Sequence, residues 1–221
     1  LAFVGREPEL ARLRGYLDAV LAGEGRAAFI VGGPGTGKTA LMRAFAKRAV
    51  DAHPDLRVVS GACTAHAGGG SAYLPFREML GMLTGDLETA WRAGTLSGRQ
   101  ARRLWSALPE TLPILIDQAP VLLSTLLHGP SVVNRAKNAG LDGASWMPEL
   151  QALSEHSVVS TFQQSALFQQ LSNALRSIAH TYPIVLMIDD LQWIDQESLS
   201  LLSHLEHQLA GARMLILGAY R

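Results

Sequence analysis

Apolar residues follow two patterns that alternate along the chain. Short, nearly continuous apolar runs predict buried strands at residues 27–31, 56–61, 184–188 and 214–217. Apolar positions three and four residues apart predict helices over residues 8–21, 38–50, 74–83, 161–179 and 196–209. Strands that alternate with helices indicate a parallel sheet with right-handed crossovers. The pattern therefore predicts an α/β fold.

Residues 86–158 fit this alternation least well. They keep a helical periodicity, but five prolines cut them into short pieces: Pro109, Pro113, Pro120, Pro130 and Pro148. We expect a helical insertion here. Within it, residues 129–145 are rich in Gly, Ser, Asn and Ala and poor in large apolar side chains, which predicts a mobile segment.

Composition narrows the function classes. A chain of 221 residues that is 48% hydrophobic suits one α/β domain with a buried core. Its 19 basic and 19 acidic residues cancel, so bulk charge gives no support for nucleic-acid binding. A single cysteine, Cys63, excludes an internal disulfide and fits a reducing cytoplasm. With no signal-peptide pattern and no apolar run near the ~18 residues of a membrane span, we expect a cytoplasmic protein without a membrane partner.

The clearest chemical signal is a glycine loop between a predicted strand and a predicted helix. It has the form G-x-x-x-x-G-K-[ST] and runs Gly32, Gly33, Pro34, Gly35, Thr36, Gly37, Lys38, Thr39, followed by Ala40. Glycines let several backbone N–H groups face one anion, and the positive end of the helix lies beneath it. Lys38 offers an ammonium to the β- and γ-phosphates, and the Thr39 hydroxyl offers an oxygen to magnesium. The alternative is a chance glycine-rich turn. We expect ATP or ADP to bind residues 33–40 with magnesium.

A second signal is the pair of carboxylates that ends the strand at residues 184–188. Asp189 is the candidate magnesium ligand, and Asp190 could orient or deprotonate the attacking water. Both would lie at the carboxyl edge of the parallel sheet, beside the glycine loop. The alternative is a pair of solvated turn residues. Because the second acid is the shorter Asp, strong hydrolytic power is in doubt.

Three stretches together resemble a known family. They are Phe3-Val4-Gly5-Arg6-Glu7, the glycine loop, and Asp189-Asp190-Leu191-Gln192-Trp193-Ile194-Asp195 with the later run Gly218-Ala219-Tyr220-Arg221. The combination resembles the signalling ATPases with numerous domains (STAND), a P-loop branch related to the AAA+ group. It looks most like the ATPase domains of large LuxR-type transcriptional regulators. The resemblance covers residues 1–80 and 160–221 and implies a three-layer P-loop NTPase sandwich.

The resemblance also implies roles outside the two motifs. Val4, Gly5 and Arg6 would lie near the adenine, or else simply lead into the first helix. Arg221 would read the γ-phosphate as a third catalytic residue beside Lys38 and Asp190, or else be a surface arginine. Trp193 is expected to pack. Asp195 is expected to cap the helix that follows it.

The resemblance further implies parts that this sequence does not contain. A complete core would continue into a fifth strand, followed by a helical lid, a winged-helix domain and effector domains. DNA binding would belong to those other parts of the parent protein. A nucleotide-dependent homo-oligomer is a further expected partner.

Three functions remain open at this point. The first is a regulatory ATPase switch whose hydrolysis changes the contacts of Arg221 and the lid. The second is a P-loop kinase for a small molecule, with residues 86–158 as a substrate lid. The third is a module that binds nucleotide and barely hydrolyses it.

Overall fold

The chain divides into two compact units. The computed structural model describes residues 5–65, 72–92, 94–155 and 164–221. One unit comprises Leu1–Met79 with Ala179–Arg221, and the other is Leu80–Ile178. The predicted insertion at 86–158 lies inside the second unit. Among the helices of these described residues, none combines the length and hydropathy needed to cross a membrane.

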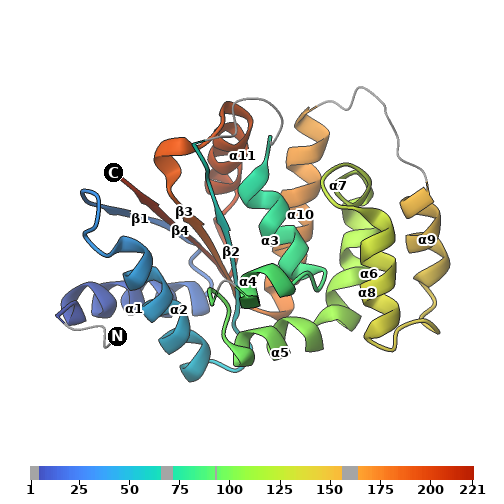
Figure 1. The fold of residues 1–221 in the computed structure, drawn as a ribbon, viewed down its shortest axis with the longest axis horizontal. Coiled ribbons are helices and arrows are strands. Elements are labelled where there is room, and N and C mark those ends of the chain that lie inside the picture. Colours follow the sequence, from blue (N-terminus) through green and yellow to red (C-terminus); the bar gives the residue numbers. More distant parts are fainter. Residues whose placement is uncertain (1–4, 66–71, 93, 156–163) are drawn as a thin grey trace. The chain divides into compact units, whose positions relative to one another are not determined.

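The first unit is built on a parallel sheet, as predicted. Its strands are β1 (Arg26–Val31), β2 (Arg57–Ala62), β3 (Ile184–Asp189) and β4 (Met214–Tyr220). They pair in the order β1-β4-β3-β2, and every pairing is parallel (Figure 1). The glycine-loop strand and the acidic strand are therefore separated by β4. All four carboxyl ends meet at one edge of the sheet, so the α/β fold is confirmed.

Helices cover both faces of this sheet. On one face lie α1 (Glu7–Leu21) and α2 (Lys38–Ala52), whose apolar sides share a core with alternate residues of β3 and β4. On the other side Figure 1 shows α11 (Gln196–His207), which buries Leu201, Leu202 and Leu205. Because the central strands are covered on both faces, β3 and β4 read as continuous apolar runs rather than as alternating ones.

A glycine sets the distance between β2 and α3 (Leu74–Leu83). A Cβ atom added to Gly61 would lie 2.2 Å from the carbonyl oxygen of Pro75 and 2.6 Å from its Cα. Both are backbone atoms and cannot rotate away. The start of α3 therefore approaches β2 more closely than any side chain at position 61 would allow.

We expect Gly61→Ala to lower the free energy of unfolding by about 1–3 kcal/mol, because the new methyl group forces α3 away from β2. Urea unfolding measures this. The matched control is Gly15→Ala in α1, where an added Cβ meets nothing within 4 Å. Alanine favours a helix, so this control should unfold at the same or a higher urea concentration. Equal midpoints for Gly61→Ala and wild type would contradict the close approach.

The second unit is helical. It contains α4 (Glu88–Arg92), α5 (Gly98–Ser106), α6 (Leu108–Gln118), α7 (Pro120–Thr125), α8 (Gly129–Asn138) and α9 (Met147–Glu155), with most of α10 (Gln164–Thr181). Hydrogen bonds fix α10 to its neighbours. The Ser177 hydroxyl donates to Gln118 Oε1 at 2.8 Å, and Val121 N–H donates to Gln170 Oε1 at 3.0 Å.

Part of the segment predicted to be mobile, at 129–145, forms a regular helix. Residues 129–138 form α8, which buries Val132, Val133 and Ala136. The helix is anchored by Arg135, whose guanidinium donates to the carbonyl oxygen of Thr84 at 2.8 Å and to its hydroxyl at 3.2 Å. Small residues signalled a loop, but here they allow close packing: the backbone of Gly129 lies against Ser154.

Candidate functional site

The glycine loop joins the end of β1 to the start of α2. Gly35 and Gly37 have φ angles of +71° and +80°, the left-handed region that glycine enters without steric cost. Gly37 is also the N-cap of α2 and, having no side chain, leaves the first N–H groups of that helix uncapped. These groups and the positive end of the helix suit an anion.

Lys38 folds back over this loop. Its Nζ donates to the carbonyl oxygens of Gly32 at 2.8 Å and Gly33 at 3.0 Å. An ammonium has three protons, so these bonds leave one for an anion bound at the loop. The hydroxyl of Thr36 also donates to the carbonyl oxygen of Gly33, at 2.9 Å.

The acidic strand meets the loop through Thr39. Its hydroxyl donates to Asp189 Oδ2 at 2.6 Å, although the two residues are 150 positions apart. The contact gathers a hydroxyl and a carboxylate, the hard oxygen donors that suit magnesium. The described residues hold no group of three or more His, Cys, Asp or Glu side chains that could bind a metal. The Thr39 hydroxyl and the Asp189 carboxylate fit Mg²⁺, which takes one or two protein ligands and the rest from phosphate and water.

Asp190 begins a tight turn after β3. Its φ of +56° is left-handed, which Asp tolerates better than most residues. Its N–H donates to Asp189 Oδ1 at 2.9 Å, and its own Oδ1 accepts from Gln192 Nε2 at 2.7 Å. No pattern in the sequence indicated this contact between Gln192 and Asp190.

Arg6 lies at the glycine loop. Its guanidinium donates to the carbonyl oxygen of Thr36 at 2.6 Å, while Gly5 before it has a φ of +90°. The start of α1 is held to α2 by Arg48, whose guanidinium donates two hydrogen bonds to the Glu7 carboxylate, at 2.7 and 2.8 Å. The hydrogen bonding from Arg48 holds the pKa of Glu7 below its ordinary value. Val4 lies outside the described residues, so its predicted place near the adenine stays a prediction.

The end of β2 adds further groups beside the acids. Cys63 N–H donates to the carbonyl oxygen of Asp189 at 3.0 Å. Burial, with several nearby carboxylates, raises the pKa of the Cys63 thiol to about 12, so it stays protonated at neutral pH. Burial also raises the pKa of Glu78, whose carboxylate accepts from Ala62 N–H at 2.8 Å. Cys63 and Glu78 therefore lie near the carboxylates of the site, at the end of β2.

Two predictions concern the turn between β3 and α11: the one for Asp195 is confirmed, and the one for Trp193 is wrong. Asp195 caps α11, as expected: its carboxylate accepts from the N–H and the hydroxyl of Ser198 at 2.8 and 2.6 Å. Burial raises the pKa of Asp195, but these bonds outweigh it and keep the pKa below its ordinary value. Trp193, expected to pack, is 46% exposed, because the 3-10 turn at Leu191–Trp193 directs Leu191 rather than Trp193 over β4.

Arg221 follows β4, whose two neighbours are β1 and β3. Gly32 N–H donates to the carbonyl oxygen of Tyr220 at 3.3 Å, and Arg221 N–H donates to Gln192 Oε1 at 3.2 Å. The backbone before Arg221 thus lies between the glycine loop and the acidic turn. The predicted catalytic role of its side chain stays a prediction.

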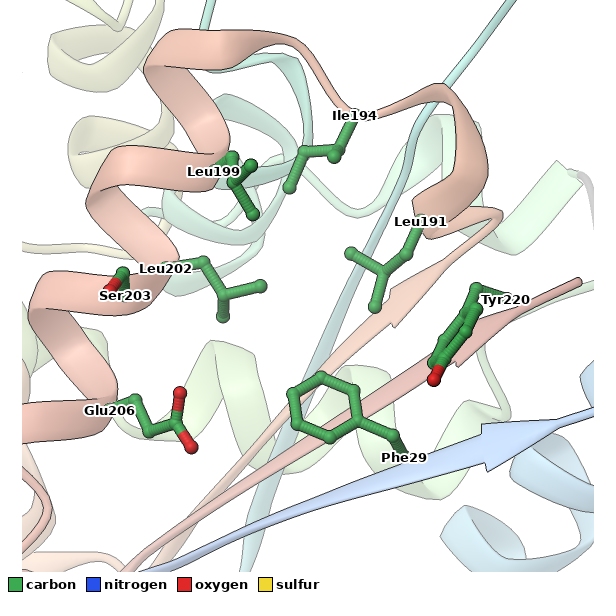
Figure 2. A pocket seen from close by; sticks show the side chains of 8 residues that line it. All are labelled: Phe29, Leu191, Ile194, Leu199, Leu202, Ser203, Glu206 and Tyr220. Atoms are coloured by element: carbon green, nitrogen blue, oxygen red, sulfur yellow. The ribbon is translucent and has the colours of Figure 1, made fainter.

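A separate apolar hollow lies on the α11 side of the sheet (Figure 2). Its lining is Phe29, Leu191, Ile194, Leu199, Leu202, Ser203, Glu206 and Tyr220. Such an apolar surface offers little to a phosphate.

The sheet has an edge at β1. Among the described strands, β1 pairs only with β4, so the other edge of β1 is open. The fifth strand that the resemblance implies could pair with this edge of β1, and it stays a prediction.

Comparison with known families agrees with this geometry. The sequence matches the AAA ATPase domain family over residues 2–217, a span that includes the glycine loop, the acidic strand and the helical second unit. Among curated proteins, none matches the sequence significantly. The match covers most of the chain, and the parallel sheet with its glycine loop has the P-loop NTPase fold. The chain therefore belongs to the AAA ATPase domain family of nucleotide-binding ATPases.

Proposed function

We propose that this domain is a regulatory ATPase switch that binds ATP with magnesium and hydrolyses it to ADP and phosphate. The observation that carries the proposal is the 2.6 Å contact between Thr39 and Asp189, because it joins the phosphate loop to the acidic strand end. Isolated motifs occur by chance, whereas two motifs that meet through complementary oxygens make one site.

We assign each residue a role in that site. The backbone of residues 33–40 cradles the phosphates, and the Lys38 ammonium neutralises their charge. Thr39 and Asp189 would hold magnesium, which would neutralise phosphate charge when bound. Asp190 orients the attacking water.

Two more roles are proposed at the edges of this site. Arg221 reads the γ-phosphate from the end of β4, since the backbone there lies between the loop and the acids. Gly5 and Arg6, with Val4, contact the base side of the nucleotide, a role supported by the bond of Arg6 to Thr36 in the glycine loop.

The output of the switch is a proposal that rests on the resemblance to STAND ATPases of LuxR-type regulators. A lid, a winged-helix domain and effector domains of the parent protein would respond to the nucleotide, with DNA contacted only through those parts. We also infer nucleotide-dependent homo-oligomers and a cytoplasmic location.

A binding module with negligible hydrolysis is the second candidate. One observation favours it: the second acid is Asp190 rather than the longer Glu, so its carboxylate reaches less far toward a water. Hydrolysis rates separate this candidate from the first.

Magnesium dependence tests the proposed site. We expect Thr39→Val, which keeps the shape but removes the hydroxyl, to abolish most of the gain in ATP affinity that Mg²⁺ gives to wild type. ATP affinity in EDTA should change little. Titration of a fluorescent ATP analogue with and without Mg²⁺ measures both. Thr125→Val is the matched control, because the Thr125 hydroxyl bonds the carbonyl oxygen of Val121 in the helical unit. An unchanged Mg²⁺ effect in Thr39→Val would remove Thr39 from the metal site.

A further inference from the structure

One side chain ties the acidic turn to the end of β4. Gln192 Nε2 donates to Asp190 Oδ1 at 2.7 Å, and Gln192 Oε1 accepts from Arg221 N–H at 3.2 Å. We propose that Gln192 is a positioning residue of the ATPase site. Its side chain holds the Asp190 carboxylate in a fixed position relative to the glycine loop. The proposal rests on the proposed function, in which Asp190 orients water.

The path from Gln192 to the glycine loop passes through a single peptide group. The carbonyl oxygen of Tyr220 accepts from Gly32 N–H at 3.3 Å, and the N–H of the same peptide, that of Arg221, bonds Gln192. A peptide group is planar and rigid, so its two ends move together. A shift of the loop at Gly32 is therefore passed to Gln192 and, through its amide, to Asp190.

The Asp190 carboxylate and the Arg221 N–H together require an amide at position 192. A carboxylate only accepts hydrogen bonds and a backbone N–H only donates them, so only one orientation of the amide satisfies both. Glutamate would keep the acceptor for Arg221 but would set a second carboxylate against Asp190. Methionine, of similar length, would make neither bond.

The backbone beneath Gln192 is also held in place. A Cβ atom at Gly218 would lie 2.4 Å from Leu191 Cδ1, so the turn packs directly on β4. Trp193 N–H donates to the carbonyl oxygen of Asp190 at 2.9 Å and closes the turn. Gln192 therefore starts from a fixed backbone, and its side chain is half-buried, which makes the bridge well defined.

Single-turnover hydrolysis with excess protein, together with nucleotide affinity and melting temperature, tests the proposal. We expect Gln192→Met to bind ATP within about twofold of wild type but to hydrolyse it about 10- to 100-fold more slowly, since small misplacements of a catalytic group cost rate rather than affinity. Gln192→Glu should be slower still, because like charges repel. Gln196→Met, at the exposed first residue of α11, is the matched control and should hydrolyse at the wild-type rate.

A double variant shows whether the effect passes through Asp190. We expect Asp190→Ala with Gln192→Met to hydrolyse no more slowly than Asp190→Ala alone, because a positioning residue has nothing left to position. A further loss in the double variant would overturn the proposal, as would wild-type rates in both Gln192→Met and Gln192→Glu. The proposed function fails separately, and takes this proposal with it, if wild type leaves its bound ATP intact.

Discussion

Replacement of Lys38 by alanine should weaken ATP binding about 10- to 100-fold, because a hydrogen bond to a charged group contributes about 1.5–3 kcal/mol. Lys38 also bonds the carbonyl oxygens of Gly32 and Gly33, so its loss loosens the loop itself. Both effects act in the same direction. Titration with a fluorescent ATP analogue measures the change.

Lys47→Ala is the matched control for this prediction. Lys47 lies on the same helix, but its side chain is 73% exposed and pairs with Asp51. The variant removes the same charge and the same side-chain length, and we expect its ATP affinity to match that of wild type. Equal affinity in Lys38→Ala and wild type would exclude the glycine loop as the phosphate site.

Asp190→Ala should slow single-turnover hydrolysis about 10²- to 10⁴-fold, the usual contribution of a general base or water-orienting group. ATP affinity should stay close to the wild-type value, since Asp189 and Thr39 keep their mutual contact. The expected signature is thus a loss of rate with binding retained. Rapid quench of bound radiolabelled ATP, with excess protein, separates the two quantities.

Asp18→Ala provides the comparison for the loss of one carboxylate. Asp18 is exposed on α1, and its removal changes the net charge by the same amount. We expect it to hydrolyse ATP at the wild-type rate. If Asp190→Ala does the same, Asp190 does not orient the water.

Local sequence patterns predicted the elements of the sheet unit well. Strands buried on both faces leave continuous apolar runs, and helices with one buried face leave a three- and four-residue spacing. The order β1-β4-β3-β2 was not predictable, because all four strands are similarly apolar and strand pairing depends on distant segments. The helix at Gly129–Asn138 was missed for a related reason: its anchor, Thr84, is remote from Arg135 in sequence.

The candidate site likewise has some features that the sequence could predict and others that it could not. The glycine loop and the acidic strand end are contiguous motifs, so the sequence predicted both and the edge of the sheet where they meet. The bonds of Arg6 to Thr36 and of Gln192 to Arg221 join residues 30 and 29 positions apart, with one partner in each case a backbone group. Because every residue carries the same backbone groups, no side-chain pattern could reveal these contacts.

Single-turnover hydrolysis of γ-labelled ATP by excess wild-type protein with Mg²⁺ tests the ATPase switch most directly. We predict that the label appears as inorganic phosphate and that Lys38→Ala fails to release it. Label that stays in bound ATP would contradict the switch and support a non-hydrolysing binding module. Label that moves to an added metabolite faster than to water would contradict it in favour of a kinase.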